Sequence, residues 1–431
     1  MKPYVQAATI GMVVALALAG CGRTADSTGV SGASESGTLV DDSPATGTIQ
    51  VWTAGGYQPA LEGILDGFAE DNPDAKVVVT DIPWAELPTK VKTSIAGGTV
   101  PDLVMIGQSQ VPAMIATGGL QAVPDGIADL SGFYPDAVTA GKGEDGTQYS
   151  IPWYVETRLF FYRTDLAEQA GIEPPTTWDE IAPFAQALGE QEGVASGLVL
   201  PVGQADSTFQ FMIPLISQAG GTVLDTQTGK WTFDTPEVVE ALTYYKSFFD
   251  AGIADTAGYG DNFVADFVSG KTGSMVSGSW MAPMLESIAS PEFVDQNVGA
   301  VVMPKGPVNN DSYIGGAQWS VFRDAENSDS AWKLVRYLST KEAQQDLYDT
   351  NHDLPALRAA WDDDPLLKAD EWSQLSMEQL ENTQLEPAVP AWDELTATIG
   401  IETEKVVHGT STPEDAAAAM QAKADSLGLG W

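Results

Sequence analysis

The chain has 431 residues, too many for one ordinary hydrophobic core and enough for two lobes of typical domain size. Hydrophobic residues make up 43% and charged residues 19% of it, a composition that excludes disorder throughout the chain. Sixty Asp and Glu against 20 Lys and Arg give a formal charge of −40, which repels phosphate backbones, so no nucleic-acid partner is expected.

The first residues predict export. Lys2 precedes an uncharged stretch from Ala7 to Gly20, which is too short for a stop-transfer helix but suits the apolar region of a signal peptide, residues 1–20. No later segment has about 18 consecutive apolar residues, so the mature body is expected to be soluble.

A lipid anchor is predicted directly after this signal peptide. Leu18-Ala19-Gly20-Cys21 resembles the bacterial lipobox, and Cys21 is the only Cys of the chain, so no intrachain disulfide can form. In such proteins the Cys becomes the acylated first residue, and two acyl chains give stable membrane anchoring. Residues 21–47 are then expected to form a lipidated flexible tether, because they are mostly Ser, Gly, Thr, Ala and Asp, and structure should begin near Thr48.

Strand and helix patterns alternate from that point. Ile49 and Val51 alternate with polar residues as in a strand, and apolar residues from Leu61 to Phe68 recur at helical spacing. Two further strands are predicted at 77–79 and 103–106, with a helix at 111–116 after the second. This alternation predicts the α/β class.

A second series of elements begins near Thr147. Strands are predicted at 149–152 and 159–162, and helices at 328–338 and 416–426. Thr177 and Glu180 have the spacing of a capping box, and Pro236 stands at a first helical position. The pattern remains mixed α/β to the end of the chain.

Motifs for chemistry are mostly lacking. With only His352 and His408, a Ser-His-Asp triad is hard to assemble, and there is no zinc spacing, so no metal and no cofactor is expected. Residues 141–146 match G-x-G-x-x-G but run into a strand-like segment, which predicts a hairpin turn. The many carboxylates leave one enzyme class open, a glycoside hydrolase with a carboxylate pair.

Aromatic residues give the positive signal. Sugars present apolar C–H faces edged with hydroxyls, so their sites need flat aromatic platforms and planar polar side chains. The chain has 12 Trp, and several aromatic residues stand beside Gly, Pro or polar residues at predicted strand ends, where open α/β folds bind ligands. These are Trp52, Tyr57, Trp153, Tyr154, Trp280, Trp319 and Trp392.

Several stretches resemble the sugar-binding proteins of bacterial ABC importers, a family that includes maltodextrin- and trehalose-binding proteins. They are the first strand at 49–53, the strand entry at 98–104, the run from Ile151 to Glu180, the segment from Phe267 to Trp280, and a return segment with Gly315-Gly316 and Leu354-Pro355. Together they span nearly the whole mature chain.

This resemblance implies two α/β lobes, joined by crossing segments, that close about a hinge over a solute in the cleft between them. Lobe I is expected to comprise residues 48–153 plus 313–364, and lobe II residues 154–312 plus 365–431. The implied partners are a carbohydrate ligand and the membrane permease subunits of an ABC importer, and the protein is expected to be a monomer on the outer face of the cytoplasmic membrane.

The resemblance also implies which side chains contact the sugar. Trp280 corresponds to the stacking Trp of the family signature, and Glu156 to a ligand-binding carboxylate with Arg158 beside it. The other implied ligand-binding residues are Tyr57, Gln58, Gln108, Gln110, Phe209, Gln210 and Trp392.

Three functions stay open at this point. A solute-binding receptor that makes and breaks no bonds fits the resemblance, an exported lipoprotein glycoside hydrolase fits the abundant carboxylates, and a receptor for peptides or metal lacks support from His clusters. The solute is also open between trehalose, a β-linked disaccharide and a maltodextrin.

Overall fold

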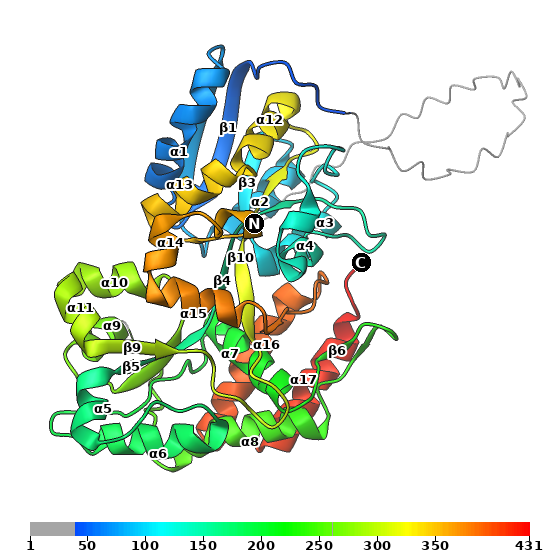
Figure 1. Ribbon diagram of the computed structural model, residues 1–431. Coiled ribbons are helices and arrows are strands. Elements are labelled where there is room, and N and C mark those ends of the chain that lie inside the picture. Colours follow the sequence, from blue (N-terminus) through cyan, green and yellow to red (C-terminus); the bar gives the residue numbers. More distant parts are fainter. Residues whose placement is uncertain (1–38, 261) are drawn as a thin grey trace, which may run out of the picture. The chain divides into compact units, whose positions relative to one another are not determined.

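The computed structural model describes residues 39–260 and 262–431, which lie within one compact unit, Gly37–Trp431 (Figure 1). The first third of the chain alternates strands with helices, as predicted. Its elements are β1 (Gly47–Ala54), α1 (Gln58–Asp71), β2 (Ala75–Ile82), α2 (Leu87–Gly97), β3 (Leu103–Gly107), the 3-10 helix η1 (Gln108–Gln110), α3 (Val111–Ala116), η2 (Leu130–Gly132), α4 (Pro135–Ala140) and β4 (Ile151–Thr157).

The middle of the chain is richer in helices. Its elements are β5 (Leu159–Arg163), α5 (Thr164–Ala170), α6 (Trp178–Gly189), α7 (Ala205–Gln218), β6 (Leu224–Asp225), β7 (Lys230–Trp231), α8 (Pro236–Asp250), α9 (Phe263–Val268), β8 (Ser274–Ser277), α10 (Met281–Ile288), α11 (Pro291–Asn297) and β9 (Val298–Val301).

The last third supplies elements to both earlier parts. They are β10 (Ser312–Val321), α12 (Ser328–Leu338), α13 (Lys341–Asn351), β11 (Leu354–Pro355), η3 (Arg358–Ala360), α14 (Pro365–Ala369), α15 (Glu371–Gln379), β12 (Thr383–Gln384), α16 (Trp392–Val407) and α17 (Pro413–Leu427).

Lobe I is built on the larger sheet. Its strand order is β11-β4-β10-β3-β1-β2, and β12 pairs with β10 off this path. β1 is parallel to β2 and β3, whereas β10 is antiparallel to β3 and β4. Leu103 to Ile106 are all buried, as expected for a central strand with apolar side chains on both faces. Asp102 fixes the entry to this strand, since its carboxylate accepts hydrogen bonds from the Gln50 and Asn327 amides at 2.8 and 2.7 Å.

Lobe II is built on the three-stranded sheet β8-β5-β9 and on helices from distant parts of the chain. In Figure 1 the carboxyl-terminal helices α16 and α17, in red, return beside α7 and α8, in green. One hydrophobic cluster joins residues 160–303 with Tyr313 and residues 389–424, so this lobe is discontinuous in sequence.

The separate cluster of lobe I contains residues 45–155 and 314–367, and also Leu380. Leu367 on α14 therefore packs in lobe I, although the predicted boundary between residues 364 and 365 assigns α14 to lobe II. The predicted lobe boundaries as a whole stay a prediction.

Two of the crossing segments are tied to each other. The Ser312 hydroxyl donates to the Arg158 carbonyl at 2.9 Å and accepts from the Arg158 amide at 3.1 Å. The Thr157 hydroxyl donates to the Tyr313 carbonyl at 2.9 Å. These bonds hold the turn from β4 to β5 against the start of β10, and so fix the positions of the side chains at this turn.

Several local predictions are confirmed. Helices α3 and α12 have the bounds predicted at 111–116 and 328–338. Glu180 accepts a hydrogen bond from the Thr177 amide at 3.1 Å, as a capping box requires. The glycine-rich segment is a hairpin turn, in which the Gly143 amide donates to the Thr147 carbonyl at 2.9 Å and Gly146 has φ of 81°.

The segment before β1 is ordered, which corrects the prediction of a flexible tether that extends to residue 47. Arg336 on α12 donates to the Val40 carbonyl at 2.7 Å, and Lys333 Nζ lies 2.8 Å from Asp41 Oδ1. Ala45 is fully buried. The sequence pattern shows few apolar residues here, but cations on α12 hold the carboxylates and carbonyls of this segment. The signal peptide, Cys21 and the earlier part of the predicted tether lie outside the described residues.

Candidate functional site

Arg158 is the centre of the candidate site. Its guanidinium is buried and lies over the rings of Trp280 and Tyr313, with the guanidinium carbon 4.4 and 5.1 Å from the ring centres. The same group donates to Gln210 and to Glu156 Oε1, the latter at 3.3 Å. The structure thus brings together four residues predicted for ligand binding, Glu156, Arg158, Gln210 and Trp280.

These residues come from different elements. Glu156 is the penultimate residue of β4, Arg158 follows this strand at the crossing, Gln210 lies on α7, and Trp280 is the residue before α10. A pocket in lobe II is lined by Arg158, Gln210 and Trp280, together with Pro201, Ser207, Phe211, Tyr259, Val276 and Ser277. Its walls combine aromatic faces with hydroxyl, amide and guanidinium groups, the combination that binds a polar molecule with apolar faces.

Close packing explains the position of the Trp280 ring. A Cβ added at Gly278 would lie 1.9 Å from Cζ3 of Trp280, so the indole lies directly on the Gly278 backbone. Only glycine leaves room for this contact. Trp280 is half-buried and keeps part of its surface free.

Tyr57 forms the matching corner of lobe I. Its ring stacks on Tyr154 with ring centres 5.4 Å apart and an interplanar angle of 8°, and it meets Trp84 edge-on at 6.5 Å. Its hydroxyl donates to Asp353. Gln58 is half-buried next to it and donates to Glu62 at 2.9 Å. This corner therefore also joins aromatic faces to a carboxylate.

Gln110 lies in lobe I near Trp84, since both side chains approach Gly107. Its Oε1 atom is buried, and no described residue donates a hydrogen bond to it. An unpaired amide oxygen in this place can accept a hydrogen bond from a bound molecule.

Three predicted residues have packing roles instead. Gln108 is 2% exposed and donates to the Ile314 carbonyl at 2.9 Å. Phe209 is 1% exposed and meets Trp392 edge-on at 5.6 Å, and Trp392 is 0% exposed. In this conformation the three side chains are packed inside the protein, and their predicted contact with a solute stays a prediction.

Sequence reasoning missed Asp353 and Trp84. Burial raises the pKa of the Asp353 carboxyl to about 7, hydrogen bonds from Tyr57 and Asn351 lower it in part, and the nearby negative charge of Glu156 raises it further. The Leu354-Pro355 pair that follows Asp353 belongs to the return segment of the resemblance, and this was the only signal for Asp353 in the sequence.

A second buried acid lies at the crossing segments. Glu386 is 3% exposed, and no described residue forms a hydrogen bond with either carboxylate oxygen. Burial raises the pKa of Glu386 to about 8, and the charges of Glu156 and Asp136 add to this.

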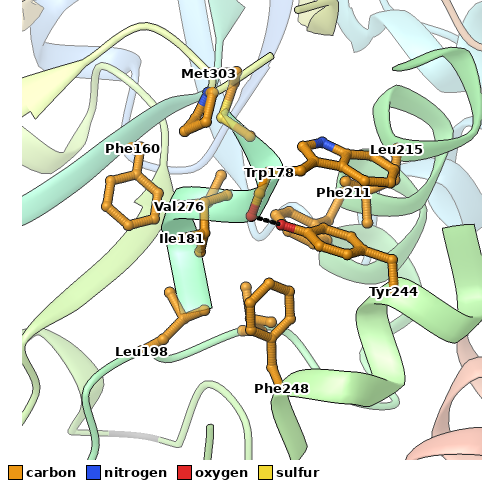
Figure 2. A pocket seen from close by; sticks show the side chains of 12 residues that line it. Phe160, Trp178, Ile181, Leu198, Phe211, Leu215, Tyr244, Phe248, Val276 and Met303 are labelled. Atoms are coloured by element: carbon orange, nitrogen blue, oxygen red, sulfur yellow. Dashed lines mark hydrogen bonds between the residues drawn. The ribbon is translucent and has the colours of Figure 1, made fainter. Parts of the chain in front are cut away.

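Lobe II also contains an apolar hollow, shown in Figure 2. Trp178 and Tyr244 stack at its edge with ring centres 3.9 Å apart, and the Tyr244 hydroxyl donates to the Trp178 carbonyl at 3.0 Å. The labelled side chains around it, such as Phe160, Leu198 and Met303, belong to the core of the lobe. This lining offers no charged group to a polar solute, and we assign the hollow to packing.

Comparison with known proteins decides the family. The family model described as bacterial extracellular solute-binding protein matches residues 54–345. The chain belongs to this family. Among bacterial extracellular solute-binding proteins, it is 26% identical to the maltooligosaccharide ABC transporter solute-binding lipoprotein of Streptococcus pneumoniae, over 90% of this chain and 89% of that protein. It is 25% identical to the diacetylchitobiose binding protein of Streptomyces coelicolor, over 89% of this chain and 87% of that protein.

Solved structures of similar fold agree. The GacH receptor of Streptomyces glaucescens, solved unliganded and with acarbose, has a TM-score of 0.80 at 24% identity and covers 89% of this chain and 98% of its own. A substrate-binding protein of Listeria monocytogenes in complex with cycloalternan has a TM-score of 0.76 at 25% identity, over 89% of this chain and 100% of its own. The two-lobe fold with an interlobe cleft is therefore the fold of this solute-binding protein.

None of the helices in the described residues is both long and apolar enough to cross a membrane. No group of three or more His, Cys, Asp or Glu side chains in residues 39–260 and 262–431 is arranged to hold a metal ion.

Proposed function

We propose that this solute-binding protein captures a saccharide between its lobes and delivers it to the permease of an ABC importer. The observation that carries this proposal is the joint setting of Trp280, Arg158, Glu156 and Gln210, in which an aromatic face lies next to planar hydrogen-bonding groups. The named relatives support it, because maltooligosaccharide, diacetylchitobiose, acarbose and cycloalternan are all saccharides or saccharide-like.

The proposed site spans both lobes. Trp280, Arg158 and Gln210 form the lobe II wall, and Tyr57, Trp84, Gln110 and Asp353 form the lobe I wall. Closure of the lobes over the solute shifts an open-closed equilibrium, and the closed form is the one that the permease recognises.

The test is a panel of mono- and oligosaccharides measured by thermal shift and calorimetry. A ligand at 100 times its Kd stabilises the folded state by about 2.7 kcal/mol. We expect a shift with one class of saccharide that is lost in Trp280→Ala and kept in Trp431→Ala, a matched variant at a Trp that is 39% exposed at the chain end. Absence of a shift with every saccharide contradicts the proposal.

We also propose that the bound saccharide leaves unchanged. Glu156 lies on β4 and Asp353 directly precedes the neighbouring strand β11, so these two carboxyl groups are the pair that a glycosidase reading would use. Glu156 is bound to Arg158, however. Both carboxyl groups also belong to the same wall of the proposed site, whereas the two carboxyl groups of a glycosidase lie on opposite sides of the glycosidic bond that is cleaved. Incubation of the protein with its saccharide, followed by chromatography, should return the saccharide intact, whereas a stoichiometric excess of shorter products would establish a hydrolase.

The lipid anchor at Cys21, the monomeric state and the position at the outer face of the cytoplasmic membrane belong to the same proposal. The lipobox and the lipoprotein name of a relative support it. We expect the full chain to partition into detergent, and Cys21→Ser to be released into the aqueous phase. Equal partition of both would contradict anchoring through Cys21.

A further inference from the structure

Asp353 and Glu156 face each other across two strands. In the antiparallel pair of β4 and β11, Leu354 lies opposite Val155 and Pro355 opposite Tyr154. One step further along the same register places Asp353 opposite Glu156. Directly opposed side chains of an antiparallel pair point to the same face with Cβ atoms about 5 Å apart, and like charges there are destabilising.

Each carboxyl group has one oxygen without a hydrogen-bond partner among the described residues. Glu156 Oε1 accepts from Arg158, and Asp353 Oδ2 accepts from both Tyr57 and Asn351. Among the described residues, no hydrogen bond reaches Glu156 Oε2 or Asp353 Oδ1. The two carboxyl groups therefore each keep one acceptor that a bound molecule can use.

The charges at this point do not balance. Arg158 pairs with Glu156 and also donates to Gln210, so its guanidinium is already engaged. Asp353 receives hydrogen bonds only from neutral groups of the described chain, Tyr57 and Asn351. A cross-strand carboxylate pair with a single cation costs stability, and a bound positive charge would remove this cost.

We propose that Asp353 determines specificity and that the solute is an amino-substituted saccharide, whose basic nitrogen binds between Asp353 and Glu156. This inference rests on the proposed saccharide-binding function. Hydrogen bonds from an ammonium group to carboxylates are about twice as strong as neutral ones. The formal charge of −40 also attracts a cationic solute over one without charge.

Proton linkage provides a signature that a merely structural role lacks. The pKa of Asp353 is raised to about 7, so part of the free protein carries a proton there at neutral pH. An ammonium group beside Asp353 favours its ionised form, so binding expels that proton. A neutral saccharide brings no such charge and should release little.

The experiment compares ligands that share a skeleton. Chitosan disaccharide carries two amines, cellobiose carries hydroxyls in their places, and N,N′-diacetylchitobiose carries neutral amides; glucosamine with glucose and galactosamine with galactose complete the panel. Each is titrated by calorimetry at pH 6.5, where the amines are protonated, in two buffers with different ionisation enthalpies. We expect an amino-substituted member to bind at least tenfold more tightly than its neutral partners, with proton release.

Variants then assign the preference to Asp353. Asp353→Asn should remove the tenfold preference and the proton release, whatever it does to the affinity for the neutral partners. Asp363→Asn, at an exposed acid paired with Lys341, should change neither. A preference that survives Asp353→Asn, or a neutral saccharide that binds as tightly as its amino partner or more tightly, overturns this inference and leaves the proposed function standing. Absence of binding by every saccharide overturns both.

Discussion

The guanidinium carbon of Arg158 lies 4.4 Å from the centre of the Trp280 ring. Arg158 is buried, and it joins Glu156 on the wall of lobe I to Gln210 on helix α7 of lobe II. One side chain therefore sets the position of an aromatic platform and of two polar groups. The integrity of the site should depend on its planar, forked shape and not only on its charge.

Replacement of Arg158 by Lys tests this dependence. Lys keeps the positive charge but cannot donate to Glu156 and Gln210 at once while it lies flat on Trp280. We expect the free energy of unfolding to fall by about 1–3 kcal/mol and saccharide affinity to fall by about tenfold or more. Chemical denaturation and calorimetry measure the two effects, and an unchanged affinity would show that charge alone is sufficient.

The substitution Gly278→Ala tests whether Trp280 is a binding platform without removing its indole ring. A Cβ at position 278 would overlap the indole ring, so Gly278→Ala should displace it. We expect about tenfold weaker saccharide binding and a changed tryptophan fluorescence, since a misplaced platform loses stacking area. Gly260→Ala is the matched control, because a Cβ there meets nothing within 4 Å. Equal affinities of the two variants would argue against a platform role.

The sequence was sufficient for most of the fold and for half of the site. Helix α12 and the capping box of α6 follow from local patterns, because periodic apolar residues and capping side chains act within a few residues. The residues joined at Arg158 were found through a resemblance of sequence motifs.

Properties that depend on distant parts of the chain could not be predicted. Asp353 acquires its role only when β11 pairs with β4, and no local pattern reveals that pairing. Trp392 follows a proline like an exposed platform, but its ring packs against Phe209 from a helix far away in sequence. The docking of Asp41 depends in the same way on cations of α12.

The contact between the segment before β1 and α12 predicts a protease-sensitive variant. Lys333 Nζ approaches Asp41, Asp329 and Ser43 within 3.0 Å, and the hydrogen bonds from Lys333 and Ser43 lower the pKa of Asp41. Lys333→Ala should release residues 40–46, so thermolysin should cut there sooner. Lys341→Ala, which loses only an exposed ion pair with Asp363, is the control. Mass spectrometry of the early fragments identifies the site, and identical cleavage in both variants would contradict the role of Lys333.

Glu386 predicts how stability depends on pH. Its pKa is raised from its ordinary value of 4.5 to about 8, mainly because burial disfavours the charged form, with Glu156 and Asp136 adding repulsion. Between these two values the folded state binds more protons than the unfolded state does at this group. Its contribution to the free energy of unfolding is therefore complete below pH 4.5 and falls as pH rises, by up to about 1.4 kcal/mol per pH unit.

Glu386→Gln removes this titration while it keeps the size of the side chain. Relative to the variant, the wild type should lose stability between pH 5 and pH 8. The raised pKa of Asp353 acts in the same direction, but it is present in both proteins and cancels in the difference between their free energies of unfolding. Chemical denaturation at several pH values gives the two curves. Glu381→Gln changes an exposed acid, and its free energy of unfolding should depend on pH as that of the wild type does. If Glu386→Gln also follows the wild type, Glu386 is ionised in the folded protein, and one of the nearby groups must supply a partner to its carboxylate that this conformation does not show.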